Sequence, residues 1–299
     1  MSVEVAGGGR LTEVLHQQRL LLNIRCGQRG LCNGCRIELL RGQVVDVGSG
    51  ERIAAPANVR ACQCRLDSDA AIRVPARSLM AHRPQIVSEF RLNVPRAHNP
   101  LAPAGVGAAV DIGTTTVAVL LADLSDGRIL RYATAYNKQM QLADDVATRI
   151  SLCGSDSAMV GRFQQLVVEE TILPLLGEEA ARLAACTVAG NTTMLHLFLG
   201  TDPTPLGTYP FRPRFLEHRV VKLPAFGGAE VHLLPGAAAY IGADITAGIL
   251  ASGLAYDSGP SLLVDVGTNG EIILKCGGRF LGCATAAGPA FEGAGLSNG

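Results

Sequence analysis

The sequence predicts a small α+β domain over residues 1–75, a proline-rich linker over 76–105 and an α/β domain over 106–299. Three observations predict this division. Five of the nine cysteines lie between residues 26 and 64, and the stretch after residue 75 is rich in proline. From about residue 106 the composition shifts to Ala, Gly, Val, Leu and Thr, and apolar runs of strand and helix length alternate. A chain of 299 residues is long enough for two domains.

The charge balance argues against a polyanionic partner. Lys plus Arg and Asp plus Glu both number 26, so the net charge is zero and neither a nucleic-acid nor a membrane-surface partner is expected. No apolar run approaches the roughly 20 residues of a membrane span, and the N-terminus lacks the apolar core of a secretory signal. We expect a cytoplasmic protein. An odd, clustered set of cysteines also disfavours a disulfide framework.

The first domain is predicted to contain one helix among short strands. We expect a strand at 3–5, a helix at 11–21, a hairpin at 35–47 with its turn at Arg41-Gly42, a second cysteine segment at 60–66 and a strand at 71–74. This order is typical of a ferredoxin-type α+β unit, except that such a unit normally begins with a hairpin. The first strand of that hairpin is therefore predicted to be missing.

The cysteine pattern of this domain indicates a metal or cluster site. Cys26, Cys32 and Cys35 are separated by five and then two residues, and the loop also contains glycines. A fourth thiol follows at Cys62 or Cys64. Sulfurs that converge in a glycine-rich loop, where backbone N–H groups point at them, can hold a [2Fe–2S] cluster. A zinc site is the alternative, but zinc ribbons prefer two C-x₂-C pairs and this chain has one.

The second domain is predicted to contain a central sheet flanked by helices. Residues 108–124 read as strand, tight turn and strand, and 261–284 repeat that pattern. Further strands are expected at 127–137 and 186–190, and helices at 143–152, 163–184, 191–200 and 241–254.

An internal repeat marks the two tight turns. VDIGTTT at 110–116 recurs as VDVGTNG at 264–270. Glycine lets backbone N–H groups approach phosphate oxygens, hydroxyls add donors, and an aspartate at the strand end can hold Mg²⁺ through its waters. The candidate residues of the first turn are Asp111, Gly113, Thr114, Thr115 and Thr116. Those of the second turn are Asp265, Gly267, Thr268, Asn269 and Gly270. The repeat resembles the paired phosphate hairpins of the actin, Hsp70 and sugar-kinase superfamily.

Three further positions leave alternatives open. Gly190, Asn191 and Thr192 lie at a strand-to-helix transition, where they bind an anion or Asn191 simply caps the helix. Asp244 is an acid in an apolar helical stretch, suited to a metal or water contact or to a structural role. His196 lies in an apolar helix and is expected in the core rather than in catalysis.

Taken in order, CGQRGLCNGC, RACQC, VDIGTTTVAV, AGNTTMLHLFLG, GADITAGIL and VDVGTNGEI resemble the ATP-dependent reductive activators of corrinoid proteins. The resemblance implies a [2Fe–2S] ferredoxin-like (β-grasp) domain fused to an actin-like (ribonuclease H-like) ATPase domain. It implies an electron passed to Co(II) of the corrinoid protein of a methyltransferase system, regenerating Co(I), with ATP and Mg²⁺ as cofactors and an upstream reductant. It also favours Cys26, Cys32, Cys35 and Cys62 as ligands, because the last ligand usually sits in an Ala-Cys-Gln context. Cys64 is then a spare thiol.

The resemblance also predicts that the second half of the ATPase domain is incomplete. In the superfamily the chain continues well beyond the second phosphate hairpin, so we expect a fragment. Two other functions fit the motifs: a small-molecule kinase with a redox-sensing cluster, and an electron carrier whose actin-like half only docks. The favoured hypothesis is an ATP-hydrolysing electron-transfer activator, with Asp111 and Asp265 as its catalytic residues.

Overall fold

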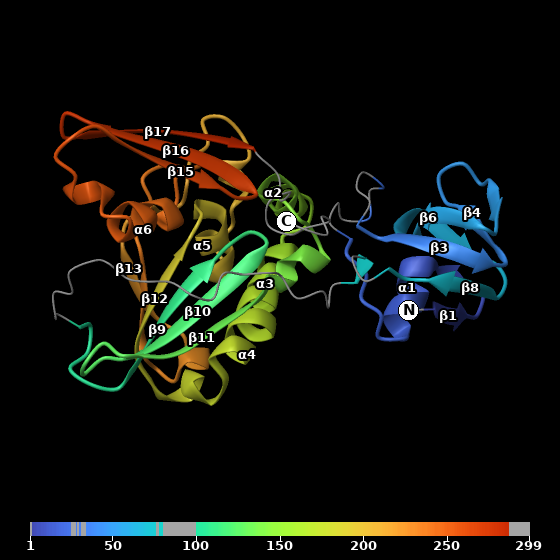
Figure 1. Ribbon diagram of the computed structural model, residues 1–299, viewed down its shortest axis with the longest axis horizontal. Helices are drawn as coiled ribbons and strands as arrows, with labels where there is room; N and C mark the ends of the chain where they lie inside the picture. The colour runs from blue at the N-terminus through green and yellow to red at the C-terminus, as the bar shows by residue number, and fades with distance from the viewer. Residues whose placement is uncertain are drawn as a thin grey trace. The chain divides into compact units, whose positions relative to one another are not determined.

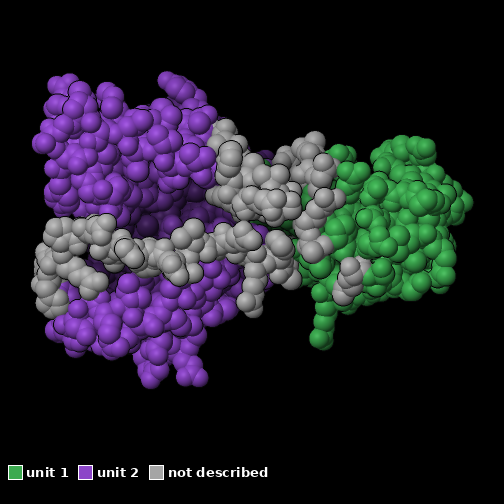
Figure 2. Space-filling view, viewed as in Figure 1, with its two compact units in different colours: residues 1–84, 140–145, 293–299 green, residues 85–139, 146–292 purple. Residues whose placement is uncertain are grey.

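The computed structural model describes residues 2–24, 28, 30, 34–75, 78–79 and 100–286. Cys26 and Cys32, most of the predicted linker and the chain after residue 286 lie outside the described residues. The chain divides into two compact units (Figure 2): unit 1 comprises residues 1–84, 140–145 and 293–299, and unit 2 comprises residues 85–139 and 146–292. Each unit is described separately below.

In the described residues, unit 1 contains two four-stranded sheets and one α-helix. One sheet has the order β1-β8-β3-β6 and the other the order β2-β7-β4-β5, and every neighbouring pair is antiparallel. Helix α1 (Leu11–Gln17) ends earlier than predicted and is followed by Arg19 at φ +62°. The strands are β1 (Ser2–Val5), β2 (Gly9–Arg10), β3 (Arg36–Arg41), β4 (Gln43–Asp46), β5 (Arg52–Ala54), β6 (Ala57–Arg60), β7 (Cys64–Leu66) and β8 (Ala70–Arg73).

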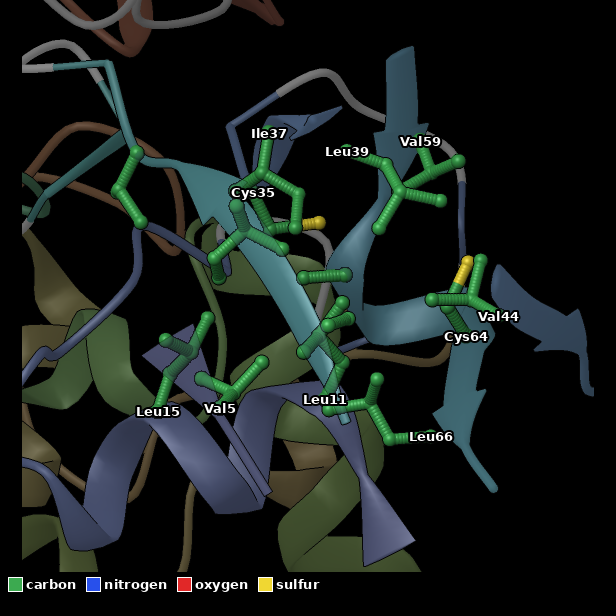
Figure 3. Packing of buried hydrophobic residues seen from close by; sticks show 14 of the residues in the cluster. Val5, Leu11, Leu15, Cys35, Ile37, Leu39, Val44, Val59, Cys64 and Leu66 are labelled. Carbon is green, nitrogen blue, oxygen red and sulfur yellow. The ribbon is translucent and has the colours of Figure 1, made fainter. Parts of the chain in front are cut away.

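A hydrophobic cluster of described residues holds these elements together. Leu11 and Leu15 of α1 pack with Ile37 and Leu39 of β3 in the same buried core, which Figure 3 shows from close by. The cysteines Cys35, Cys62 and Cys64 belong to this cluster. The thiols of the predicted site are therefore anchored in the core of the unit, so a change in their positions requires the core to repack.

The predicted hairpin at 35–47 is wrong in its pairing. Both strands exist, but β3 pairs with β6 and β8, whereas β4 pairs with β5 and β7 in the other sheet. The chain passes from one sheet to the other at Gly42, which has φ +92°; a Cβ there would lie 2.8 Å from the Asp69 carbonyl oxygen. Two strands with a glycine between them have the same sequence pattern whether they pair with each other as a hairpin or belong to two different sheets.

Unit 2 contains a six-stranded sheet of order β11-β10-β9-β12-β14-β13. β9, β10 and β11 form an antiparallel meander, and β12 pairs in parallel with both β9 and β14. This central sheet confirms the α/β prediction, although the last two strands were not predicted. The strands are β9 (Val106–Ile112), β10 (Thr116–Asp123), β11 (Ile129–Tyr136), β12 (Leu183–Gly190), β13 (Arg219–Lys222) and β14 (Glu230–Leu233).

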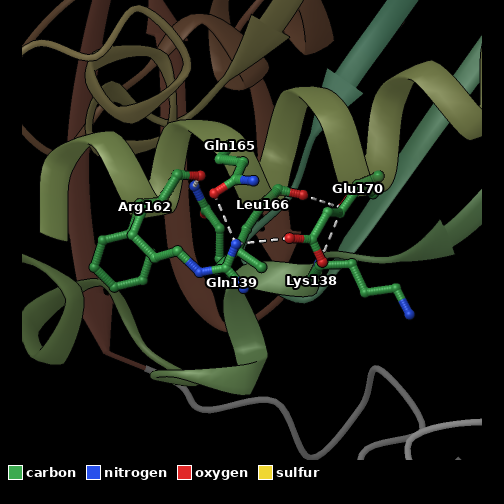
Figure 4. Close-up of polar contacts among 8 residues, drawn as sticks. Lys138, Gln139, Arg162, Gln165, Leu166 and Glu170 are labelled. Atoms are coloured by element: carbon green, nitrogen blue, oxygen red, sulfur yellow. Dashed lines mark hydrogen bonds and ion pairs between the residues drawn. The ribbon is translucent and has the colours of Figure 1, made fainter.

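The long helix predicted at 163–184 is interrupted. It consists of α3 (Ala158–Val167), a π-helical turn η4 (Val168–Ile172), α4 (Leu173–Leu176) and a 3₁₀ segment η5 (Gly177–Arg182). Pro174 lacks an N–H donor, which weakens the regular ladder at this point. Arg162 spans the π-helical turn, donating to Glu170 (2.7 Å) and to Gln165 (2.9 Å), as Figure 4 shows.

The remaining elements of unit 2 include three helices and a second sheet (Figure 1). Helices α2 (Val146–Ser155) and α5 (Thr192–Phe198) accompany the six-stranded sheet, and α6 (Ala243–Ala251) packs Ile245 and Ile249 against Leu263 and Ile273 of a second sheet. That sheet is β15 (Ser261–Val266), β16 (Asn269–Cys276) and β17 (Arg279–Ala286). In the part of the chain that is described, no helix is long and apolar enough to cross a membrane.

The bend at Gly42 generates the first prediction. Gly42→Ala should destabilise unit 1 by about 1–3 kcal/mol, because the new Cβ meets both a positive φ and the Asp69 carbonyl. Gly50→Ala is the matched control: its φ is +74° but nothing lies within 4 Å of the added Cβ. Amide hydrogen exchange of peptides from β3 to β8 measures unit 1 alone. Equal losses of protection in the two variants would show that the collision contributes nothing.

Candidate nucleotide and cluster sites

The first VDxGT turn, between β9 and β10, is held from behind by three hydrogen bonds to successive carbonyl oxygens. The Asn137 side chain donates to the Gly113 carbonyl (2.9 Å), Arg149 donates to the Thr114 carbonyl (2.6 Å), and the Asn137 backbone N–H donates to the Thr115 carbonyl (2.8 Å). In a trans peptide the C=O and the following N–H point in opposite directions. The N–H groups of residues 114–116 are therefore turned away from Asn137 and Arg149, as an anion-binding turn requires.

This support is rigid because its donors are themselves fixed. The Arg149 side chain is fully buried and also donates to Gln139 Oε1 (2.8 Å), while Gln139 Nε2 donates to the Phe163 carbonyl of α3 (3.0 Å). The adjacent Lys138 N–H donates to the Thr171 hydroxyl (3.1 Å) in the π-helical turn. A buried charge and buried amides are costly unless they are hydrogen-bonded, so this network has one favourable arrangement.

The second VDxGT turn meets the first. Gly267 N–H donates to the Asn269 carbonyl (3.0 Å) to close the turn between β15 and β16. The hydroxyls of Thr115 and Thr268 are 2.8 Å apart, and both side chains are buried. The two copies of the repeat, 153 positions apart, are thus in direct contact. This juxtaposition is the arrangement that the repeat predicts.

Four acidic side chains interact around these turns. Burial raises the pKa of Asp111 to about 6, with smaller contributions from Asp244 and Asp265. Burial likewise raises the pKa of Asp244 to about 6, and that of Glu271 to about 7. Asp265 and Glu271 are directly opposite each other on β15 and β16. Like charges that share a poorly solvated region disfavour each other's ionisation, so a cation bound near them would be stabilised.

Asp111 is strongly desolvated although its side chain has solvent-exposed surface. A carboxylate that lines a concave surface combines this desolvation with exposure, because protein surrounds it on most sides and water reaches it on one side. Figure 2 shows a hollow in the surface of unit 2 on the face that is drawn. Among the described residues, no group of three or more His, Cys, Asp or Glu side chains is placed to bind a metal ion directly.

The candidates at 190–192 connect structural elements. A Cβ on Gly190 would lie 2.8 Å from the Ile112 carbonyl oxygen, so glycine is needed where β12 passes β9. Asn191 Oδ1 accepts from Met194 N–H (3.0 Å), which caps α5, and Asn191 Nδ2 donates to the Thr114 hydroxyl (3.0 Å). The Thr192 hydroxyl donates to the Ala238 carbonyl (3.0 Å). Helix capping, one of the two alternatives, is therefore what Asn191 does in this structure, and it also orients Thr114.

His196 lies in the core, as expected. Its Nε2 accepts from Arg214 N–H (2.9 Å), so the proton is on Nδ1, which donates to the Thr192 carbonyl (2.7 Å). Burial lowers the pKa of His196. The ring stacks on Phe215 at 4.4 Å between centroids. A neutral histidine with both nitrogens engaged has a structural role.

Two of the predicted cysteine ligands are described, and both are buried. A hydrogen bond with Cys35 is the largest of the interactions that lower the pKa of Cys62 to about 6. Gln63 Nε2 lies 3.5 Å from Cys62 Sγ and donates to the Gln28 carbonyl (2.7 Å), while the Thr12 hydroxyl donates to Gln28 Oε1 (3.0 Å). The donors around Cys62 favour its thiolate, the form in which a cysteine binds an iron–sulfur cluster.

Cys64 differs from Cys62 in its surroundings. Burial, with smaller effects from Asp46 and Cys62, raises the pKa of Cys64 to about 11. A thiol held in its neutral form is a poor ligand. This environment favours Cys62 over Cys64 as the fourth ligand.

Several supporting residues escaped sequence analysis. Glu271 could have been found, because a turn flanked by the pair Val266 and Gly270 places residue 271 opposite Asp265. No sequence signal identifies Asn137, Gln139 and Arg149, because they support the turn at 113–115 only when the fold brings their segments against it. Gln63 follows a predicted ligand but could not be given a partner from spacing alone.

Comparison with known proteins gives consistent matches. Residues 106–257 match the family described as the RACo middle region, and residues 259–299 match the C-terminal domain of RACo, the ASKHA domain. A curated relative from Eubacterium limosum, the corrinoid activation enzyme RamQ, is 34% identical over 205 residues, 64% of this chain and 34% of that protein. A [Co(II) methylated amine-specific corrinoid protein] reductase from Methanosarcina barkeri is 30% identical over 213 residues, 64% of this chain and 38% of that protein.

A solved structure extends the comparison to nearly the whole chain. The reductive activator for a corrinoid, iron–sulfur protein superposes with a TM-score of 0.65 at 28% identity, covering 99% of this chain and 63% of that one. The chain therefore spans about a third of the length of the two curated relatives and less than two thirds of this structure. The matches confirm the ASKHA, or actin-like, fold of unit 2.

The carboxylates generate the second prediction. Asp244→Asn should stabilise unit 2 at pH 7.5 by about 1–2 kcal/mol, or about 2–8 °C in Tm, because it removes a like charge and keeps the acceptor for the Ile245 N–H. A carboxyl whose pKa is raised on folding costs nothing below its unfolded pKa near 4, and its full penalty applies above its folded pKa near 6. The gain should therefore shrink by half or more at pH 5.

Scanning calorimetry at the two pH values measures this difference. Asp126→Asn, at an exposed site between β10 and β11, is the control for a simple change in net charge. A gain from Asp244→Asn that is the same at pH 5 and pH 7.5 would contradict the electrostatic explanation.

Proposed function

The chain belongs to the RACo family, and on that premise we propose that it is a reductive activator that uses ATP to deliver one electron to the Co(II) of a corrinoid protein. The observation that carries this proposal is the 2.8 Å contact between Thr115 and Thr268. It joins two phosphate-type turns in one site, which an electron carrier without a nucleotide function would not need. The names of the relatives supply the corrinoid substrate.

The nucleotide part of the proposal rests on the two turns. The N–H groups of residues 114–116 are donors suited to phosphate oxygens. The hydroxyls of Thr115 and Thr268 are hydrogen-bonded to each other, so one of the two keeps its proton to donate to a phosphate. Gly113 and Gly267 let the backbone approach the phosphates closely. A Cβ on Gly113 would lie 2.5 Å from the Thr116 carbonyl oxygen, so the tight turn itself requires glycine.

The acidic groups fit a hydrated Mg²⁺. Mg²⁺ usually keeps several of its waters and binds proteins through one or two carboxylates together with phosphates. Asp111 and Asp265 would hold it through those waters, and Asp244 and Glu271 add negative charge nearby.

The cluster part of the proposal rests on unit 1, which we take as a ferredoxin-like domain. Cys26, Cys32, Cys35 and Cys62 would hold a [2Fe–2S] cluster, which supplies a one-electron carrier when bound. The buried pair Cys35 and Cys62 and the Gln63 amide beside Cys62 fit such a group. Gly30 belongs to the same arrangement, because a Cβ there would lie 2.8 Å from Gln63 Cδ.

The balance of the reaction is simple. An upstream reductant provides one electron, Co(II) of the corrinoid protein accepts it to become Co(I), and one or more ATP molecules are hydrolysed to ADP and phosphate. We propose the corrinoid protein of a methyltransferase system as partner, a cytoplasmic setting, and residues 76–105 as the linker between the two domains.

The third prediction tests the proposal itself. Anaerobic protein with a reductant should convert a Co(II) corrinoid protein to Co(I), followed at the cobalamin absorbance bands, and omission of ATP should lower the rate at least tenfold. Asp111→Asn and Asp265→Asn should each remove most of the ATP-dependent part, because the cation loses a carboxylate. Rates that do not depend on ATP, in wild type and in both variants, would contradict the proposal of ATP coupling.

The fourth prediction concerns the fourth ligand. Cys62→Ser should abolish or strongly reduce the EPR signal of the reduced [2Fe–2S] cluster, because it removes a thiolate ligand. Cys64→Ser is the matched control two residues away and should retain the signal. The reverse result would assign the ligand to Cys64, and loss of the signal in neither variant would exclude both.

A further inference from the structure

A buried hydrogen bond joins the first VDxGT turn to the start of helix α5. Asn191 Nδ2 donates to Thr114 Oγ1 at 3.0 Å, between residues 77 positions apart in the chain. Both residues are almost fully buried, with 9% of Asn191 and 4% of Thr114 exposed. The backbone of Thr114 belongs to the proposed phosphate site, so the direction in which its hydroxyl proton points matters for a bound phosphate.

The orientation of the Asn191 amide is fixed by its second hydrogen bond. Its Oδ1 accepts from the Met194 backbone N–H (3.0 Å) in the first turn of α5. A backbone N–H can only donate, so the amide oxygen faces α5 and the NH₂ group faces Thr114. Because an NH₂ group is only a donor, Thr114 Oγ1 is the acceptor in the bond that joins the two side chains.

The hydroxyl proton of Thr114 is therefore available to a ligand. Among the residues that the structure describes, the bond with Asn191 is the one hydrogen bond of Thr114 Oγ1, and it does not use the proton. A buried hydroxyl whose proton has no acceptor costs free energy. An anion that accepts this proton removes the cost, which favours a phosphate oxygen at this position.

The position of Asn191 is held on both sides by closely packed backbone. A Cβ on Gly190 would lie 2.8 Å from the Ile112 carbonyl oxygen at the end of β9, and a Cβ on Gly242 would lie 2.5 Å from Asn191 Cα. Asn191 can therefore move only if these segments repack. A donor fixed in this way holds the Thr114 hydroxyl in place before a ligand binds, so little conformational freedom is left to lose on binding.

We propose that Asn191 is a positioning residue that makes the Thr114 hydroxyl a donor to a phosphate oxygen of the nucleotide rather than a ligand of Mg²⁺. The inference rests on the proposed function, because it requires a nucleotide at these turns. The Asn191 N–H group places partial positive charge beside the hydroxyl oxygen, which disfavours the approach of a cation. The same bond leaves the hydroxyl proton for the phosphate. Asp111 and Asp265 keep the role of holding the cation through its waters.

The experiment measures nucleotide affinity in the full chain by isothermal titration calorimetry. The probe is AMP-PNP, a non-hydrolysable ATP analogue, with Mg²⁺ and separately with EDTA. Thr114→Val removes the hydroxyl at nearly constant shape, and Thr114→Ser keeps a hydroxyl. Asn191→Ser removes the amide donor but retains an oxygen that can cap α5. Thr204→Val is the matched control, because it removes the hydroxyl of a half-buried threonine in η6 (Thr204–Leu206) that bonds to Asp202.

The proposal expects losses that depend on the Thr114 hydroxyl and not on Mg²⁺. Thr114→Val should weaken binding about tenfold, with Mg²⁺ and with EDTA alike, because a hydrogen bond to a charged oxygen is lost. Asn191→Ser should weaken binding about threefold. The double variant should be no weaker than Thr114→Val alone, since Asn191 acts through Thr114. Thr114→Ser and Thr204→Val should stay within about twofold of wild type, and hydrogen exchange of α5 in Asn191→Ser should match wild type.

Other results would overturn the proposal. A loss in Thr114→Val that appears only with Mg²⁺ would make the hydroxyl a cation ligand. Additive losses, about thirtyfold in the double variant, would show that Asn191 acts independently of Thr114. An equal loss in Thr204→Val would assign the effect to general destabilisation. A wild-type chain that binds no AMP-PNP would refute the nucleotide part of the proposed function and this inference with it, whereas wild-type binding with unchanged affinity in both single variants, Thr114→Val and Asn191→Ser, refutes the inference alone.

Discussion

The contact between the hydroxyls of Thr115 and Thr268 is the constraint on which unit 2 depends. It joins turns that belong to different sheets. It can hold the two turns in place only because each turn is also fixed by contacts within its own part of the fold. Asn137 and Arg149 hold the carbonyls of the first turn, and the β15–β16 ladder holds the second. A displacement of either turn would break a buried hydrogen bond, so this bond helps to keep the two copies of the repeat in place.

Sequence reasoning recovered the features that depend on local pattern. The VDxGT repeat, the strands beside it and helices α5 and α6 follow from apolar periodicity and from glycine between strands, which are short-range properties. It was wrong where the outcome depends on partners far along the chain. The strands before and after Gly42 look like a hairpin but enter different sheets, and the helix at 163–184 is broken by a π-helical turn whose Thr171 accepts from Lys138.

The same division applies to the sites. The repeat names Asp111, Asp265 and the two threonines as candidates, and the neighbours of Cys62 name it as a candidate ligand. Asp244 and Glu271 join Asp111 only through the fold, and Arg149 is invisible as a supporting residue until Thr114 is seen to lie against it. Donors such as Arg149, which hold the carbonyl oxygens of the turn, have no sequence motif, because any element that passes behind the turn can supply them.

Unit 2 keeps acidic groups close together beside its site. Burial raises the pKa of Asp111, Asp244 and Glu271, and repulsion from Asp265 adds to each shift. A sequence selected for stability alone would avoid such a group. The like charges are costly in the isolated fold and become favourable when a counter-charge binds, so this acidic group marks where the proposed hydrated cation would bind.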